Sequence, residues 1–105
     1  MISVMNNTKW RELRKAMSCL GAASPQWKVK ILSTGYQSNW DGDWCYHFAD
    51  DNYSDIEWVE IKVDGEPQRS LVLNALKNVH VAGSLTEDGY RIYGYVSDFN
   101  SVDYL

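Results

Sequence analysis

The spacing of apolar residues changes along the chain, and this change limits the fold more than any other feature. Near the N-terminus, apolar residues recur every three or four positions: Trp10, Leu13, Met17 and Leu20. This spacing predicts an amphipathic helix that is capped by Asn7 or Thr8 and ends at Gly21. Residues 26–32 alternate apolar and polar side chains instead, which predicts a strand with one buried face.

An aromatic stretch follows the Asp-Gly-Asp turn signal at residues 41–43. Residues 44–48 predict a second strand, because their side chains alternate on a period of two. One face of this strand would be wholly aromatic: Trp44, Tyr46 and Phe48. The opposite face would carry Cys45 and His47.

Residues 56–63 are rich in β-branched side chains and predict a third strand. The alternation in this stretch is imperfect, because the apolar positions change parity between Trp58 and Val59. Such a change indicates either a β-bulge near these two residues or a strand that is covered on both faces.

The last third of the chain adds a second helix and further strands. Pro67 suits the first turn of an amphipathic helix over residues 68–78, and a turn at residues 86–89 precedes a strand over residues 90–96. The chain therefore predicts an α+β fold of two amphipathic helices packed on an antiparallel sheet of four or five strands, in the order α-β-β-β-α-(β)-β. A length of 105 residues leaves room for one hydrophobic core, so residues 1–105 are expected to form a single domain.

Charge is unevenly distributed along the sequence. Residues 1–34 carry a net charge of +5, residues 35–66 carry −8, and residues 67–105 carry −1. The acidic middle block would repel the phosphates of nucleic acids and attract a basic protein surface. A solvated, charged sheet edge that prevents aggregation is the structural alternative for this block.

The N-terminal residues do not combine a basic end with an apolar run, so no secretory signal is predicted. No apolar run approaches the roughly 20 residues that span a bilayer. We therefore expect a cytoplasmic protein that does not enter the membrane, with Met1 or Met5 as its first residue. Cys19 and Cys45 are expected to be reduced, packed thiols in such a compartment.

Few residues suggest an enzyme. Cys45 and His47 resemble a thiol–imidazole pair, but a nucleophile and its base normally come from different elements. A calcium loop starting at Asp50 would need Gly at its sixth position, where Asp55 stands. We therefore predict no metal and no cofactor. A small-ligand or metal-dependent enzyme centred on His47 and nearby carboxylates is kept as the alternative.

A protein-recognition surface is the better-supported hypothesis. Trp and Tyr are enriched where partners dock, and acidic neighbours steer a basic partner into place. The central block interleaves both types, and its predicted partner-binding residues are Trp40, Asp41, Asp43, Trp44, Asp50, Asp51, Tyr53, Asp55 and Glu57. A domain this small also needs large side chains in its core, so about half of its aromatic residues are expected to be buried.

The chain resembles a family of short, uncharacterised bacterial proteins over nearly its whole length. The matching motifs are Asn7-Thr8-Lys9-Trp10, Trp40-Asp41-Gly42-Asp43-Trp44, Tyr46-His47-Phe48, Ile56-Glu57-Trp58-Val59 and Gly89-Tyr90-Arg91-Ile92-Tyr93-Gly94-Tyr95. The resemblance implies no active site, because that family has no assigned activity. In size and acidity the chain is also similar in style to bacterial immunity proteins that neutralise toxin domains.

These observations predict a non-enzymatic, cytoplasmic protein-binding domain. Its expected partner is a basic protein, for example a nuclease toxin that the domain would neutralise as an immunity protein. Nucleic acids and membranes are not expected as partners. The domain is expected to be a monomer or a homodimer, and a homo-oligomeric structural domain is a further alternative.

Overall fold

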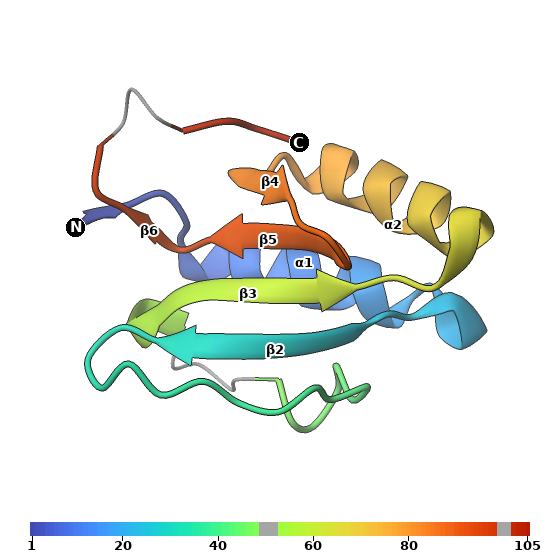
Figure 1. Ribbon diagram of the computed structural model, residues 1–105, viewed down its shortest axis with the longest axis horizontal. Coiled ribbons are helices and arrows are strands. Elements are labelled where there is room, and N and C mark those ends of the chain that lie inside the picture. Colours follow the sequence, from blue (N-terminus) through green and yellow to red (C-terminus); the bar gives the residue numbers. More distant parts are fainter. Residues whose placement is uncertain (49–52, 99–101) are drawn as a thin grey trace.

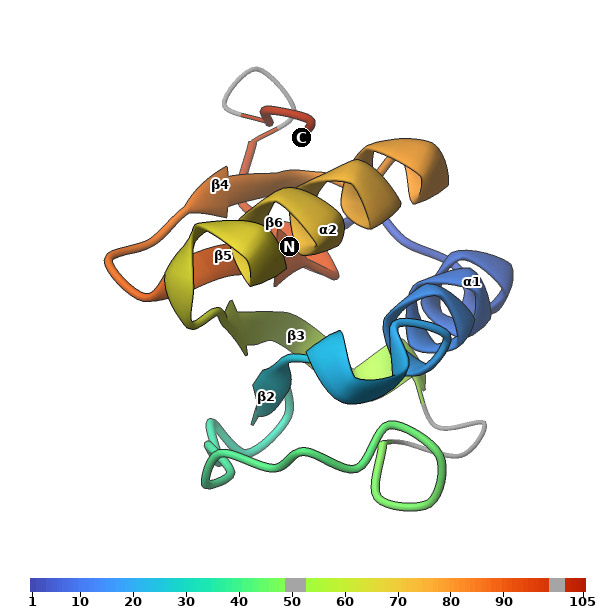
Figure 2. The same ribbon diagram turned by 90° about the vertical axis from the view of Figure 1, so that its right-hand side faces the viewer.

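Two helices cover one face of an antiparallel sheet in the computed structural model, which describes residues 1–48, 53–98 and 102–105 (Figures 1 and 2). The main sheet has the strand order β2-β3-β5-β4. Its members are β2 (Gln26–Ile31), β3 (Ile56–Lys62), β4 (Gly83–Leu85) and β5 (Gly89–Tyr93). A smaller sheet pairs β1 (Ile2–Ser3) with β6 (Tyr95–Val96), and the helices are α1 (Asn7–Ser18) and α2 (Gly65–Val79). The predicted α+β class is therefore confirmed.

The helix α1 forms where the apolar spacing predicts it, and its buried residues are Trp10, Leu13 and Met17. Its N-cap is Asn6, not Asn7 or Thr8 as predicted, because the Asn6 side chain accepts a hydrogen bond from the Lys9 N–H at 2.8 Å. The helix ends at Ser18, shortly before Gly21, which adopts a left-handed backbone with φ of 59°.

The helix α2 begins at Gly65, earlier than the predicted residue 68, and Pro67 lies in its first turn as predicted. It buries an apolar stripe of Val72, Leu76 and Val79. His80 ends the helix in a left-handed conformation, with φ of 64°. Among the described residues, neither helix has the length and apolar content to cross a membrane.

The predicted bulge in β3 is confirmed and lies at Glu57. Ile56 is paired with Ile31 and Trp58 with Lys30, so Glu57 is an additional residue on its strand. Beyond the bulge the core face of β3 continues through Val59 and Ile61, both of which are buried. The bulge therefore explains the parity change: it returns Ile56 to the core, whereas Trp58, next to the core residue Val59, lies on the sheet face opposite the helices.

The predicted strand over residues 44–48 is wrong, because residues 44–47 form a single turn. The Asp43 carboxylate Oδ1 accepts hydrogen bonds from the N–H groups of Cys45 at 2.8 Å and Tyr46 at 2.9 Å, as an N-cap residue does. In a turn of this kind, residues four apart share a side. Trp44 and Phe48 are accordingly buried, whereas the Tyr46 side chain is 85% exposed.

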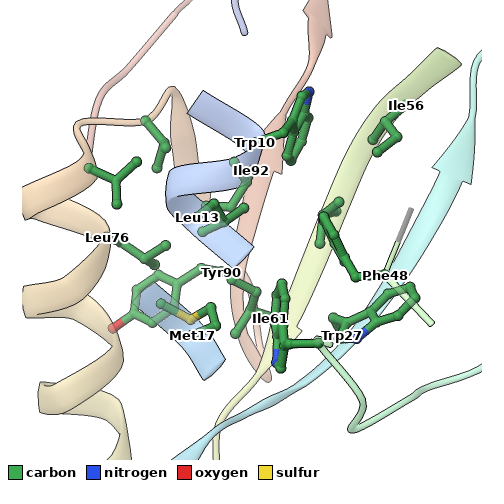
Figure 3. Packing of buried hydrophobic residues seen from close by; sticks show 14 of the residues in the cluster. Trp10, Leu13, Met17, Trp27, Phe48, Ile56, Ile61, Leu76, Tyr90 and Ile92 are labelled. Carbon is green, nitrogen blue, oxygen red and sulfur yellow. The ribbon is translucent and has the colours of Figure 1, made fainter. Parts of the chain in front are cut away.

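The core lies between the sheet and the two helices (Figures 2 and 3). In Figure 3, Leu13 and Met17 of α1, Leu76 of α2 and Ile92 of β5 converge between the helices and the sheet. An aromatic cluster fills the end of the core nearest β2, and its members are Trp10, Trp27, Trp44, Phe48 and Tyr53. Each of these five side chains is at most 5% exposed.

Both outer strands of the main sheet are covered along their free edges. Trp27 of β2 exchanges backbone hydrogen bonds of 2.8 Å with Asp41, and Ser38 donates its N–H to Val29. On the other side, the Gly83 N–H of β4 donates to Asp103 near the C-terminus. This covering protects strand edges from pairing with other chains, and it fixes the start of the loop that follows Asp41.

Gly94 connects the two sheets at a point that has no room for a side chain. Its N–H donates to the Glu57 carbonyl, and a Cβ there would lie 2.2 Å from the Ile56 carbonyl oxygen. We expect Gly94→Ala to lower the free energy of unfolding by about 1–3 kcal/mol, because the backbone must shift. Gly42→Ala is the matched control, since a Cβ at Gly42 meets no atom within 4 Å. Chemical denaturation checks both variants, and equal losses would contradict the proposed close approach.

Candidate functional site

Residues 41–48, here called the Tyr46 loop, form an ordered turn that is fixed from several sides. Asp41 Oδ1 accepts the Asp43 N–H at 2.8 Å, and Asp43 in turn caps the residues after it. Arg14 of α1 donates from Nε to the Trp44 carbonyl at 2.7 Å and from a terminal nitrogen to the Cys45 carbonyl. These bonds satisfy backbone groups that a loop would otherwise leave to water.

Two buried aromatic side chains anchor the Tyr46 loop in the core. The Trp44 indole N–H donates to the Pro25 carbonyl at 2.8 Å, and the Phe48 ring lies 5.0 Å from the Trp27 ring centre. Tyr46 lies between these anchors in the sequence and points the other way, with 85% of its surface exposed. The loop therefore presents one large aromatic side chain to solvent on a fixed backbone.

His47 lies beside two carboxylates on this loop. Its Nδ1 is 2.8 Å from Asp41 Oδ2, and its Nε2 is 3.8 Å from Asp43 Oδ2. The hydrogen bond to Asp41 raises the pKa of His47, and the negative charges of Asp41 and Asp43 act in the same direction. The backbone N–H of Tyr46 lowers the pKa of Asp43, and that of Cys45 adds to this effect.

The predicted partner-binding residues that the structure describes do not all lie at the surface. Trp44 and Tyr53 are each only 2% exposed, so both are core residues and this part of the prediction is wrong. Asp55 accepts hydrogen bonds from the N–H and hydroxyl groups of Ser33. Asp50 and Asp51 lie outside the described residues.

Trp40 and Glu57 are placed near cations on the open face of the sheet. The Trp40 ring lies 5.0 Å from Lys28 Nζ and 5.6 Å from Lys62 Nζ. Glu57 lies 3.4 Å from Lys30 Nζ. Of the predicted acidic and aromatic set, Asp41 and Asp43 lie on the Tyr46 loop, together with Tyr46, which the sequence analysis placed on one strand face with Trp44 and Phe48.

The sequence did not predict a pocket of about 520 Å³ on the sheet face opposite the helices. Its lining includes Trp58 and Tyr93, whose hydroxyl lies 3.1 Å from that of Ser84. The pocket cations are both paired: Lys30 contacts Glu57, and Arg91 donates to Glu60 at 2.8 Å. The pocket therefore offers a ligand little net charge. In the sequence, only the parity change between Trp58 and Val59 indicated that Trp58 faces the pocket side of the sheet.

Catalytic chemistry at the Tyr46 loop has a limited basis. The His47–Asp41 pair could orient an imidazole as a general base, but the His47 side chain is 64% exposed. Over the described ranges, no three His, Cys, Asp or Glu side chains are grouped so that they could hold a metal. Cys19 and Cys45 are free thiols as expected, but both are exposed, so the prediction of packed thiols is wrong. The alternative of an enzyme centred on His47 stays a prediction.

The opposite placement of Tyr46 and Phe48 can be tested by truncation. We expect Phe48→Ala to lower the free energy of unfolding by about 3–5 kcal/mol, because it leaves a cavity in the aromatic cluster. Tyr46→Ala should change it by less than about 0.5 kcal/mol, because the ring is exposed. Thermal and chemical denaturation of the two variants measure the difference. Similar losses of stability in the two variants would contradict the turn and support the strand over residues 44–48 that the sequence predicted.

The raised pKa of His47 gives a pH dependence with a defined sign. Because the folded pKa lies above the ordinary value of about 6.5, the contribution of His47 to stability is fully present below pH ~6.5 and is lost as pH rises through the folded pKa. The imidazole should therefore titrate above 6.5 in an NMR titration. Asp41→Asn should lower this pKa, whereas Asp88→Asn, outside the loop, should not. An unchanged pKa in Asp41→Asn would contradict the pairing.

Comparison with known proteins agrees with the resemblance that the motifs indicated. No curated protein and no solved structure matched the chain. A sequence family matches residues 1–99, which include α1, the Tyr46 loop and the six strands that the structure describes. The chain therefore belongs to the family of unknown function DUF6678.

Proposed function

We propose that this chain is a non-enzymatic protein-binding domain whose Tyr46 loop docks on a basic surface of its partner. The observation that carries this proposal is the 85% exposure of Tyr46 on a turn whose neighbours Trp44 and Phe48 are buried. A large aromatic ring held outward by core anchors has no role in packing of the domain itself. It has the properties of a residue that is buried when a partner binds.

The rigidity of the Tyr46 loop favours tight binding. Ordering a flexible loop on association costs free energy, and here the backbone is already fixed by Asp43, Arg14 and the two core anchors. Tyr has few rotatable bonds, so its burial costs little side-chain entropy. Most of the free energy from burying the ring would therefore appear as affinity.

The charge at the Tyr46 loop favours a basic partner. Asp41 and Asp43 precede Tyr46 on the same loop, and the segment that contains them, residues 35–66, carries a net charge of −8. Such charges accelerate association with an oppositely charged protein and disfavour acidic competitors. Protonated His47 would weaken this field, so binding should be stronger at a pH above the pKa of His47 than below it.

A basic toxin, such as a nuclease, is the partner that we propose, with this domain as the cytoplasmic immunity protein. A small acidic domain with a rigid, exposed recognition loop can cover the basic, substrate-binding surface of such an enzyme. In this role the domain needs no catalytic group of its own. The charge block and the Tyr46 loop support this role; a homo-oligomeric structural domain stays an alternative prediction.

The partner can be identified by cross-linking from position 46. Tyr46 is replaced with the photoreactive residue p-benzoylphenylalanine in the cells that produce the protein, and Leu85, which is 70% exposed on β4, is replaced likewise as the control. We expect position 46 alone to cross-link one basic protein, which mass spectrometry identifies. Identical cross-linked species at both positions, or none at position 46, would contradict the proposed surface.

Binding to the captured partner then separates the aromatic contact from the charge. Tyr46→Ala should weaken binding by at least about 2 kcal/mol, as expected for a central interface residue. Asp41→Asn with Asp43→Asn keeps both acceptor oxygens of the turn and removes only the charges, so we expect a roughly tenfold weaker, less salt-sensitive complex. Titration calorimetry at two salt concentrations measures both. Wild-type affinity in both variants would refute the proposal.

A further inference from the structure

The pocket of about 520 Å³ on the open face of the main sheet, here called the sheet pocket, is separate from the Tyr46 loop: its described lining residues include none from residues 41–48. Side chains of three neighbouring strands line it, namely Trp58 of β3, Ser84 of β4, and Arg91 and Tyr93 of β5. Lys30 of β2 and Glu57 at the bulge also line it. Its volume lies within the roughly 300–1,000 Å³ that small-molecule sites occupy. The sheet pocket therefore has the size of a site for a small ligand.

Arg91 is fixed in the sheet pocket on two sides. Its guanidinium carbon lies 4.4 Å from the centre of the Trp58 ring. The Glu60 carboxylate accepts hydrogen bonds from Nε of Arg91 at 2.8 Å and from one of its terminal nitrogens. The other terminal nitrogen has no hydrogen-bond partner among the described residues. Arg91 therefore has two N–H donors left for a ligand, on a group whose position is set by its neighbours.

The other polar groups of the sheet pocket supply donors and acceptors side by side. The hydroxyls of Ser84 and Tyr93 lie 3.1 Å apart, so one donates to the other and one hydroxyl proton is left for a ligand. Lys30 Nζ lies 3.4 Å from Glu57 Oε2, and this contact uses one of three ammonium protons and one of two carboxylate oxygens. A ligand that both donates and accepts hydrogen bonds can therefore be held at several points.

The pairing of the charged side chains disfavours an ionic ligand. A phosphate or a carboxylate would compete with Glu57 and Glu60 for the two cations and would leave these carboxylates unpaired. Their side chains are only 20% and 13% exposed, so the loss of a partner is costly. A cationic ligand would find both carboxylates already paired with Lys30 and Arg91. The sheet pocket is therefore better suited to a neutral ligand.

A flat aromatic ligand and an apolar ligand also fit poorly. Trp58 is 6% exposed and its ring lies beneath the Arg91 guanidinium, so the ring has no open face on which a base could stack. An apolar ligand would displace water from the hydroxyls and the guanidinium and leave these groups unpaired. The ligand must therefore be polar as well as neutral.

From these constraints we infer that the sheet pocket binds a neutral polyhydroxylated ligand, a mono- or disaccharide. Each sugar hydroxyl donates one hydrogen bond and accepts others, which matches the adjacent donors and acceptors of the pocket. The C–H groups of a sugar ring can pack against Tyr93 and Tyr95, which both line the pocket and are half-buried. This site does not depend on the partner that we propose for the Tyr46 loop.

Sugar binding is measured by two-dimensional NMR of the isotope-labelled protein with glucose, galactose, N-acetylglucosamine, maltose and cellobiose. We expect at least one of these sugars to shift the Trp58 indole N–H signal saturably at millimolar concentration. Tyr93→Phe removes only a hydroxyl and should weaken this binding roughly fivefold. Tyr36→Phe, at a tyrosine that is 62% exposed outside the pocket, is the matched control and should leave it unchanged.

Adenosine and inorganic phosphate serve as the comparison ligands in the same titration. Saturable shifts with either of them and with none of the sugars would overturn the inference, as would no binding of any sugar. Sugar binding that is equally strong in Tyr93→Phe and in the wild type would place the sugar outside the sheet pocket and would also overturn it.

The argument from paired charges has a separate test with glucose 6-phosphate. Glu57→Gln leaves Lys30 without its carboxylate, so this anionic sugar should bind the variant at least roughly threefold more tightly than the wild type. Glu66→Gln is the matched control, because Glu66 is 82% exposed on α2 and lies outside the pocket. Equal affinity in Glu57→Gln and the wild type would show that the ion pair does not select a neutral ligand, and the inference would fail.

Discussion

The contacts of Phe48 with four other aromatic rings hold the central segment of this protein to its core. The centre of the Phe48 ring lies 4.9 Å from the ring centre of Trp44 and 5.0 Å from that of Trp27. The corresponding distances to Tyr53 and Trp10 are 6.1 Å and 6.3 Å. Trp10 belongs to α1 and Trp27 to β2. Trp44 lies in the Tyr46 loop, and Tyr53 lies just before β3. Aromatic pairs at such separations each add about 0.5–1.5 kcal/mol beyond the area that they bury. One side chain therefore joins a helix, a sheet edge and a long connection.

The exposure of Tyr46 follows from this anchoring. The side chains of Trp44 and Phe48 both enter the core, and Asp43 caps the turn that they begin and end. Tyr46, at the middle of this turn, therefore points away from the core. The same geometry places Asp41 and Asp43 at the surface beside His47. The exposed ring and carboxylates of the loop are thus a consequence of core packing, which holds them on a fixed turn.

The periodic parts of the fold could be predicted from the sequence, because burial of one face imposes a spacing that is visible in the residues. The helix α1, the strand β2 and the parity change of β3 are examples. The stretch Trp44-Cys45-Tyr46-His47-Phe48 could not be assigned in this way, because aromatic residues at positions 44 and 48 fit both a strand and a helical turn. The choice depends on Asp43, whose carboxylate caps the following N–H groups, and a period-based interpretation gives that side chain no weight. The same error put Tyr46 on one face with Trp44 and Phe48 and placed Cys45 in a strand.

Charge along the sequence also differs from charge on the folded surface. Antiparallel pairing of β2 with β3 brings the basic first block against the acidic middle block, where Lys28 pairs with Glu60 and Lys30 with Glu57. These pairs lie on the open sheet face and cancel much of the asymmetry there. Asp41 and Asp43 lie outside these pairs, on the Tyr46 loop beside His47. The net charge of −8 over residues 35–66 therefore overstates the charge that the folded surface presents along β2 and β3.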